Sequence, residues 1–136
     1  MPGEQLSCFV DPGRILGRFM RTILCVDDHR GALATLSLIL RRHGYRCITA
    51  ENSVEADRRF VANAIDLVII DHGLPDMDGA TVAARLKSLR PVMVLMLSGN
   101  SELVAKPPAI DLLLAKPIEP DVLIEAIDEL IESARA

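Results

Sequence analysis

The stretch Leu67-Val68-Ile69-Ile70-Asp71 contains four large aliphatic residues in succession and ends in a carboxylate. A short, unbroken apolar run predicts a strand that is buried on both faces. Such strands are typical of parallel sheets that are covered by helices on each side. Residues 22–26 (TILCV) have the same character and run into Asp27 and Asp28. Two buried strands that both end in acidic residues therefore set the framework of the fold.

Helix-like and strand-like segments alternate around these two runs. Further strands are predicted at residues 46–50, 92–97 and 112–114. Apolar residues at spacings of three and four predict helices that end before Gly44, begin at Asn52, follow the loop of residues 72–76, and start near Pro120. The alternation predicts an α/β fold, a doubly wound parallel sheet with helices on both faces.

Size and composition favour one domain. The chain has 136 residues, half of them hydrophobic, which is enough for a single aliphatic core. Residues 1–19 have no regular period and contain several glycines and prolines, so we expect a tail there, disordered or a non-native extension, and a folded domain over residues 20–136. We see neither a membrane-length apolar segment nor a signal-peptide pattern, and expect a cytoplasmic protein without membrane contact.

Charge and cysteine content argue against several functions. The net charge of −4 argues against nucleic-acid binding, because proteins that bind nucleic acid carry a basic face. Cys8, Cys25 and Cys47 lack the C-x-x-C spacing of zinc sites, and their odd number suits a reducing compartment. Nucleotide binding has no support either, since the sequence has no Walker A motif and no G-x-G-x-x-G fingerprint.

Five polar residues fall at the carboxyl ends of predicted strands: Asp27, Asp28, Asp71, Ser98 and Lys116. Ligands of open α/β sheets bind outside these ends, so we expect the five side chains to share one pocket. Three crowded carboxylates repel one another, and oxygen ligands of this kind suit Mg²⁺. Asp71 can then act as a nucleophile toward phosphorus. Lys116 supplies a cation and Ser98 a hydroxyl group for phosphoryl oxygens.

The same residues resemble the receiver domains of two-component signal transduction, the CheY-like family. The resemblance is carried by ILCVDD at residues 23–28, by Asp71 followed by LPDMDG at residues 74–79, by Ser98-Gly99, and by Lys116-Pro117. All four pieces occur in order, and the resemblance covers nearly all of residues 20–136. It implies a flavodoxin-like sheet of five parallel strands in the order 2-1-3-4-5.

The resemblance also implies a function. Asp71 would accept a phosphoryl group from a phosphohistidine, carried by a sensor histidine kinase or a His-containing phosphotransfer protein, and the modified domain would switch its partner binding. Mg²⁺ would be held by Asp27, Asp28, Asp71 and the backbone carbonyl of Gly73, with Asp28 the more direct of the first two. Ser98 and Lys116 would complete the reactive site, and the Lys116–Pro117 bond is a candidate cis peptide. Such a domain is no enzyme, since it catalyses only its own phosphorylation and dephosphorylation.

Two departures from the family pattern affect the expected output. Leu113 stands three residues before the lysine, where the family usually has Tyr or Phe, so coupling between Ser98 and an aromatic ring is in doubt. The connection of residues 99–110 is short, and Pro107 and Pro108 block helix at its end. The fourth helix should be short or irregular, covering at most residues 101–106.

Alternative interpretations concern context and chemistry. The chain can be a receiver excised from a hybrid kinase or a transcriptional regulator, or a receiver-like interaction module that is never phosphorylated. A phosphohydrolase of the haloacid-dehalogenase type needs a second Asp two positions after the nucleophile, where this sequence has Gly73. His29 and His72 flank the acids, but we interpret them as exposed loop residues because Mg²⁺ prefers oxygen ligands.

Overall fold

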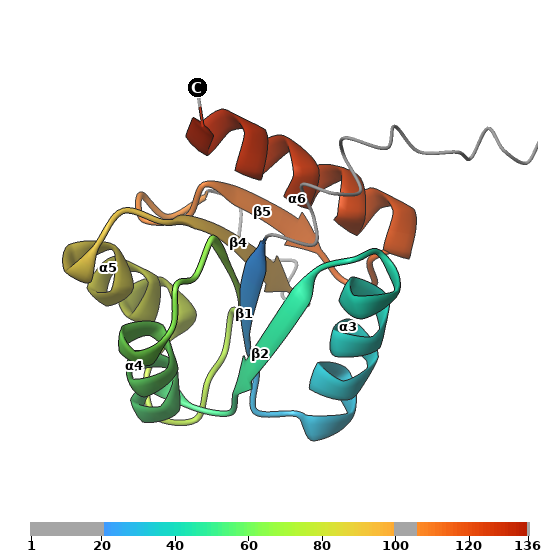
Figure 1. Ribbon diagram of the computed structural model, residues 1–136. Coiled ribbons are helices and arrows are strands. Elements are labelled where there is room, and N and C mark those ends of the chain that lie inside the picture. Colours follow the sequence, from blue (N-terminus) through green and yellow to red (C-terminus); the bar gives the residue numbers. More distant parts are fainter. Residues whose placement is uncertain (1–20, 100–105, 136) are drawn as a thin grey trace, which may run out of the picture.

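Five parallel strands form one sheet in the order β2-β1-β3-β4-β5 (Figure 1). The structure, a computed structural model, describes residues 21–99 and 106–135. In chain order, the elements are β1 (Thr22–Val26), α3 (Arg30–Arg42), β2 (Arg46–Ala50), α4 (Ser53–Ala62), β3 (Leu67–Asp71), α5 (Gly79–Leu89), β4 (Met93–Ser98), β5 (Leu112–Ala115) and α6 (Pro120–Arg135). The predicted doubly wound sheet and its strand order are confirmed.

Two sequence-based predictions lie outside the described residues. One is the tail expected at residues 1–19, and the other is the short fourth helix expected within residues 101–106. Of that second range only Lys106 is described, and it is not helical. None of the helices within the described ranges is long and apolar enough to cross a membrane.

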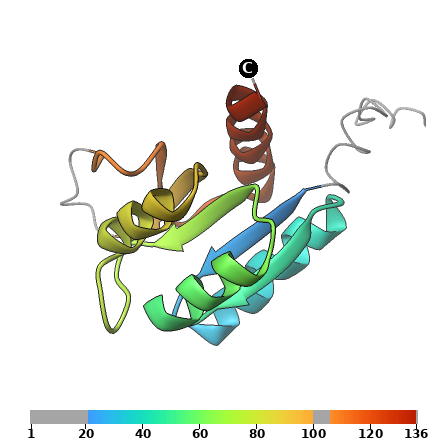
Figure 2. The same ribbon diagram turned by 60° about the vertical axis from the view of Figure 1, so that its left-hand side comes forward.

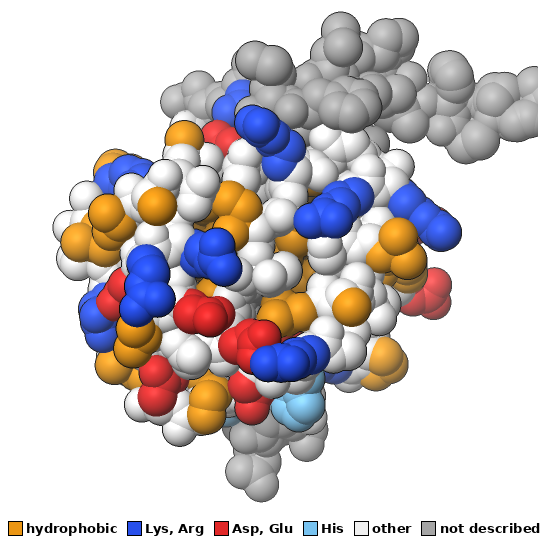
Figure 3. Space-filling model, turned by 60° about the horizontal axis from the view of Figure 1, so that its bottom comes forward, with side chains coloured by type: hydrophobic (Ala, Val, Ile, Leu, Met, Phe, Trp, Pro, Cys, Tyr) orange, Lys and Arg blue, Asp and Glu red, His pale blue; other side chains and the backbone are white. Residues whose placement is uncertain are grey.

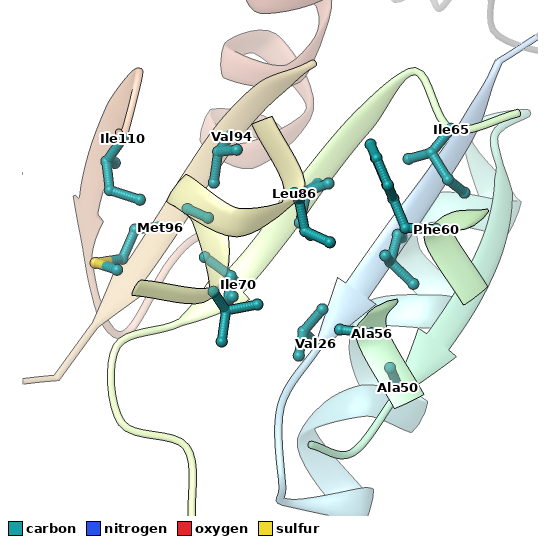
Figure 4. Close-up of a cluster of buried hydrophobic side chains, with 14 residues drawn as sticks. Val26, Ala50, Ala56, Phe60, Ile65, Ile70, Leu86, Val94, Met96 and Ile110 are labelled. Carbon is teal, nitrogen blue, oxygen red and sulfur yellow. The ribbon is translucent and has the colours of Figure 1, made fainter. Parts of the chain in front are cut away.

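Within the described residues, each face of the sheet is covered by two helices, and α4 and α5 lie side by side on one of the faces (Figure 2). Consecutive strand residues point to opposite faces, so an unbroken apolar strand supplies both cores. Val68 and Ile70 pack in the α4/α5 core, together with Phe60 and Leu86 (Figure 4). The other face packs against α3 and α6 and includes Ile69. This two-sided burial explains the unbroken apolar runs of the central strands.

Local signals end and begin the helices where the sequence predicts. After α3, Gly44 has a φ of 91°, and its N–H donates to the carbonyl of Arg41 while that of Tyr45 donates to the carbonyl of Leu40. This Schellman motif requires the left-handed conformation that glycine adopts without cost. At the start of α4, the Asn52 side chain accepts a hydrogen bond from the N–H of Glu55, as the predicted cap requires.

A carboxylate fixes the beginning of β5 to its neighbours. Asp111 accepts hydrogen bonds from the Lys87 ammonium group (2.6 Å) and from the backbone N–H of Val94 (2.8 Å). Its own N–H donates to the carbonyl of Val94 at 2.9 Å. The Lys87 side chain on α5 and the Val94 backbone on β4 thus fix the chain just before β5. From there β5 pairs with β4, from Leu95↔Leu112 to Ser98↔Ala115.

Candidate phosphoacceptor site

The carboxyl ends of four strands place the predicted site residues at one edge of the sheet. Asp71 is the last residue of β3 and Ser98 the last of β4, while Asp27 and Lys116 directly follow β1 and β5. The parallel register pairs Val26 with Ile70, Asp71 with Leu97, and Ser98 with Ala115, so these strands end at the same level. Figure 3 shows this face of the molecule, with acidic side chains gathered between basic ones.

Lys116 joins two of the carboxylates. Its Nζ lies 2.5 Å from Oδ1 of Asp71 and 4.0 Å from Oδ2 of Asp27. The two Asp side chains are about one-tenth exposed, 11% for Asp71 and 10% for Asp27, whereas that of Lys116 is 35% exposed. The structure therefore brings Asp71, Asp27 and Lys116 together, as predicted, with the lysine between the carboxylates and solvent.

Asp27, Asp28 and His29 form a second group beside this ion pair. Potential ligand atoms of these three residues lie within 4.8 Å of one another. Nδ1 of His29 lies 3.2 Å from Oδ1 of Asp27 and 3.2 Å from Oδ1 of Asp28. The backbone N–H of His29 also donates to Asp27, at 3.0 Å. His29 is exposed, as predicted, but it contacts both carboxylates, which the sequence reasoning did not anticipate.

The loop after β3 folds back onto Asp71. The N–H of Gly73 donates to Oδ2 of Asp71 at 3.1 Å, and Gly73 forms an isolated antiparallel bridge with Asp78. The N–H of Gly79 donates to the carbonyl of His72 at 3.0 Å. Backbone groups therefore fix one carboxylate oxygen of Asp71 while Lys116 holds the other. The role of the Gly73 carbonyl as a metal ligand stays a prediction.

Ser98 and Lys116 are linked through the backbone. The N–H of Lys116 donates to the carbonyl of Ser98 at 2.9 Å, and Ser98 is only 4% exposed. The Lys116–Pro117 peptide bond is cis, as the sequence indicated. Leu113 lies on β5, half-buried, where its side chain packs against the α4/α5 core. The position that usually carries an aromatic ring therefore belongs to the core here.

One contact near the site has no counterpart in the sequence reasoning. The carboxylate of Asp76 accepts hydrogen bonds from the Ser53 hydroxyl at 2.5 Å and from the Ser53 N–H at 3.2 Å. The hydroxyl of Ser53 is the main reason why the pKa of Asp76 lies below its usual value. This contact ties the loop after β3 to the first turn of α4. Ser53 and Asp76 are 23 positions apart, so no local pattern could have revealed it.

Asp78, in contrast, could have been found from its spacing. Its side chain accepts hydrogen bonds from the N–H of Thr81 at 3.0 Å and from the Thr81 hydroxyl at 2.9 Å. These bonds, with the N–H of Thr81 first, lower the pKa of Asp78. An Asp three residues before a Thr at the start of a helical pattern is a readable N-cap signal. Asp78 therefore caps α5.

Comparisons of the sequence with known proteins identify a family and several relatives. A family model for the response regulator receiver domain matches residues 23–128. The transcriptional regulatory protein GlrR of Escherichia coli (strain K12) is 33% identical over 117 residues, which are 82% of this chain and 26% of that protein. The sensor histidine kinase RcsC of Salmonella typhimurium is 33% identical over 118 residues, 83% of this chain and 12% of that protein. The chain thus spans a small part of the length of these relatives.

Solved structures share the fold over nearly their whole length. The response regulator protein TrrA of Thermotoga maritima, solved in complex with Mg(2+)-BeF, is 31% identical with a TM-score of 0.77, and the match covers 82% of this chain and 99% of that one. A response regulator from Chloroflexus aurantiacus is 32% identical with a TM-score of 0.75, and covers 82% of this chain and 98% of that one.

Proposed function

Because the chain belongs to the response regulator receiver domain family, we propose that Asp71 accepts a phosphoryl group from a phosphohistidine and that the modified domain switches partner binding. The observation that carries this proposal is the position of Asp71, held at one oxygen by Lys116 and at the other by the Gly73 N–H. A carboxylate fixed at both oxygens is oriented toward an incoming phosphorus atom, and positioning is the main requirement of phosphoryl transfer.

The transfer itself needs few groups. An oxygen of Asp71 attacks phosphorus, the phosphorus–nitrogen bond of the donor phosphohistidine breaks, and the donor imidazole keeps the electron pair and takes up a proton. Lys116 then pairs with a phosphoryl oxygen in place of the carboxylate, and the Ser98 hydroxyl donates a hydrogen bond to another. The acyl phosphate is later hydrolysed in the same site, so the phosphoryl group is added to and removed from the domain's own Asp71.

The carboxylate group fits a magnesium ion. Asp27 and Asp28 offer oxygen atoms close together, and oxygen is the ligand that Mg²⁺ prefers. We propose that Asp27, Asp28 and Asp71 hold the ion with the carbonyl of Gly73, and the Mg(2+)-BeF complex of the relative TrrA supports this choice. The ion would neutralise the charge of the phosphoryl group during transfer. His29 is an unsuitable ligand for Mg²⁺, and we expect it to orient the two carboxylates.

The relatives support a proposal about the partner and the context. One relative is a sensor histidine kinase and another a transcriptional regulatory protein, and both are much longer than this chain. A histidine kinase or a His-containing phosphotransfer protein would donate the phosphoryl group. A second candidate function is that of the receiver module within a longer regulator or hybrid kinase, which the small covered shares of 26% and 12% favour.

Acetyl phosphate labelling tests the proposal. With Mg²⁺ present, the wild-type protein should gain one phosphoryl group that is lost on mild base treatment, and Asp71→Asn should gain none. Asp121→Asn is a matched control, because Asp121 lies exposed in the first turn of α6. Equal labelling of wild type and Asp71→Asn would place the phosphoryl group elsewhere. No labelling of a folded wild-type protein would favour the non-phosphorylated interaction module.

A further inference from the structure

Two cysteine thiols face each other across the edge of the sheet. Sγ of Cys25 on β1 and Sγ of Cys47 on β2 lie 3.6 Å apart and share a hydrogen bond. The register pairs Ile23 with Cys47 and Cys25 with Thr49, so the two cysteines are diagonal neighbours. Both pack on the face that is covered by α3 and α6. No function proposed above uses either thiol.

The two sulfur atoms occupy different surroundings. Cys25 is fully buried, so its sulfur is shielded from solvent. Cys47 lies half-buried on the edge strand β2. The hydrogen bond with Cys25, the Ser37 hydroxyl and the Arg41 cation together outweigh the effect of burial and lower the pKa of Cys47 to about 7. One partly accessible sulfur with a lowered pKa therefore lies next to one buried sulfur.

We propose that Cys25 and Cys47 are a redox-sensitive pair that a hydroperoxide converts into a disulfide between β1 and β2. Cys47 reacts first, because it is the more accessible sulfur and the one stabilised as a thiolate. Its sulfur attacks the outer peroxide oxygen, the O–O bond breaks, and the departing oxygen takes up a proton and leaves as water or an alcohol. Cys47 is then a sulfenic acid.

The buried partner completes the reaction. The sulfur of Cys25 gives up its proton and attacks the sulfur of Cys47, and the hydroxyl group of the sulfenic acid leaves as water. In total the two thiols lose two electrons and two protons, and one hydrogen peroxide becomes two waters. Disulfide sulfurs are about 2.0 Å apart, so the pair must approach from 3.6 Å. Because the two residues are diagonal and not directly paired, this approach also has to draw the two strands together.

The position of Cys25 connects the pair to the acidic site. Asp27 follows Cys25 by two residues, directly after the end of β1, and donates its N–H to the carbonyl of Ala50, at the end of β2. Drawing β1 and β2 together at the cysteines therefore acts on the backbone that presents Asp27. This consequence rests on the proposed function. We expect oxidised protein to be labelled by acetyl phosphate several-fold more slowly than reduced protein.

Peroxide treatment of the folded full chain tests the pair. In a Cys8→Ser background only Cys25 and Cys47 remain, and hydrogen peroxide should remove two hydrogens from the intact mass, reversibly on reduction by dithiothreitol. After alkylation and trypsin, the peptides of residues 22–30 and 47–58 should be linked. Cys25→Ala should instead accumulate a sulfenic acid on Cys47 that dimedone captures.

The outcomes separate the two proposals. Quantitative alkylation of both thiols after peroxide, or sulfinic acid at Cys47 beside a reduced Cys25, overturns the pair, whether or not the Cys25→Ala variant folds. A disulfide that leaves labelling unchanged overturns the link to Asp27 alone. If reduced protein is never labelled at Asp71, the phosphoacceptor function fails while the mass and peptide results still decide the cysteine pair.

Discussion

Gly79 lies against the backbone of Asp71: a Cβ atom on residue 79 would be 2.4 Å from the Asp71 carbonyl oxygen and 3.0 Å from the terminal carbon of Met96. The first turn of α5 thus rests directly on the residue that we propose as phosphoacceptor. Any side chain at this position must push α5 away from β3 or shift Asp71. The requirement here is for space, since among the described glycines only Gly44 has a positive φ.

Gly79→Ala should therefore impair both stability and labelling. The clash is with backbone atoms, which cannot rotate away, and overpacking of this kind costs about 1–3 kcal/mol of unfolding free energy. Gly31→Ala, in the first turn of α3, is the matched control, because a Cβ at residue 31 has no atom within 4 Å. Urea unfolding and acetyl phosphate labelling of the two variants would check this. Equal behaviour of both would mean that α5 can move at no cost.

The contact between Asp76 and Ser53 should make stability depend on pH. The pKa of Asp76 is lowered in the folded protein, chiefly by the Ser53 hydroxyl, so the carboxylate form stabilises the fold. This contribution is complete above the unfolded pKa of about 3.9 and is lost as pH falls through the lower folded pKa. Asp76→Asn should lower stability at pH 7, and the difference should vanish in acid.

A double-mutant cycle identifies the partner in this contact. In a Ser53→Ala background, Asp76→Asn should have a much smaller effect, because the hydroxyl donor is already gone. Thermal unfolding from pH 7 down to pH 3 provides the measurement. An unchanged effect of Asp76→Asn in the Ser53→Ala background would show that another group stabilises the Asp76 carboxylate.

Removal of Asp28 should separate metal binding from folding. Asp28→Ala takes away one of the clustered carboxylates, so the labelling rate should lose its dependence on Mg²⁺ concentration. The melting temperature without Mg²⁺ should not fall, because the variant also loses repulsion from Asp27. A magnesium titration of labelling, with Asp121→Ala as control, measures both effects. Undiminished Mg²⁺ affinity in Asp28→Ala would contradict the ligand role.

Phe60 should be a major contributor to stability. Its side chain is fully buried in the α4/α5 core, and the Arg90 guanidinium lies over the ring, 4.1 Å from its centroid. Phe60→Ala should cost about 3–5 kcal/mol, since it opens a cavity. Val61 is the next residue of the same helix and is 67% exposed, and Val61→Ala should change stability by less than about 0.5 kcal/mol. Chemical unfolding of both variants gives the comparison.

The strand pattern was readable from the sequence because burial on both faces leaves long apolar runs. The predicted bounds of β1 and β2 agree with the structure, whereas β3, β4 and β5 each continue one residue further, and β4 begins at Met93 and not at Val92. Asp71 and Ser98 account for two of these extensions. Both are polar, so the apolar run stops before them, yet the register still pairs Asp71 with Leu97 and Ser98 with Ala115. An apolar run in the sequence indicates which residues are buried, whereas the ends of a strand depend on which residues pair through their backbones.

The sequence predicted those site residues whose positions depend only on where the strands end. The carboxyl ends of the parallel strands bring Asp27, Asp71 and Lys116 to one edge of the sheet, independently of the conformation of the loops. The contacts of His29 with two carboxylates, and of Asp76 with Ser53, depend on how loops fold back, which strand periodicity does not specify. The thiol contact of Cys25 with Cys47 depends on strand order and register together, so it emerged only from the three-dimensional arrangement.

Asp111 has a consequence for protein engineering. Its bonds to Lys87 and Val94 fix the start of β5, and the bond from Lys116 to the Ser98 carbonyl fixes its end. Hydrogen bonds at the start and at the end of β5 therefore position Lys116, and its position does not depend on the length of the connection that begins at Gly99. Lengthening a loop costs little, about 0.6 kcal/mol for each doubling. A sensor peptide or affinity tag inserted directly after Gly99 should therefore leave the lysine beside Asp71.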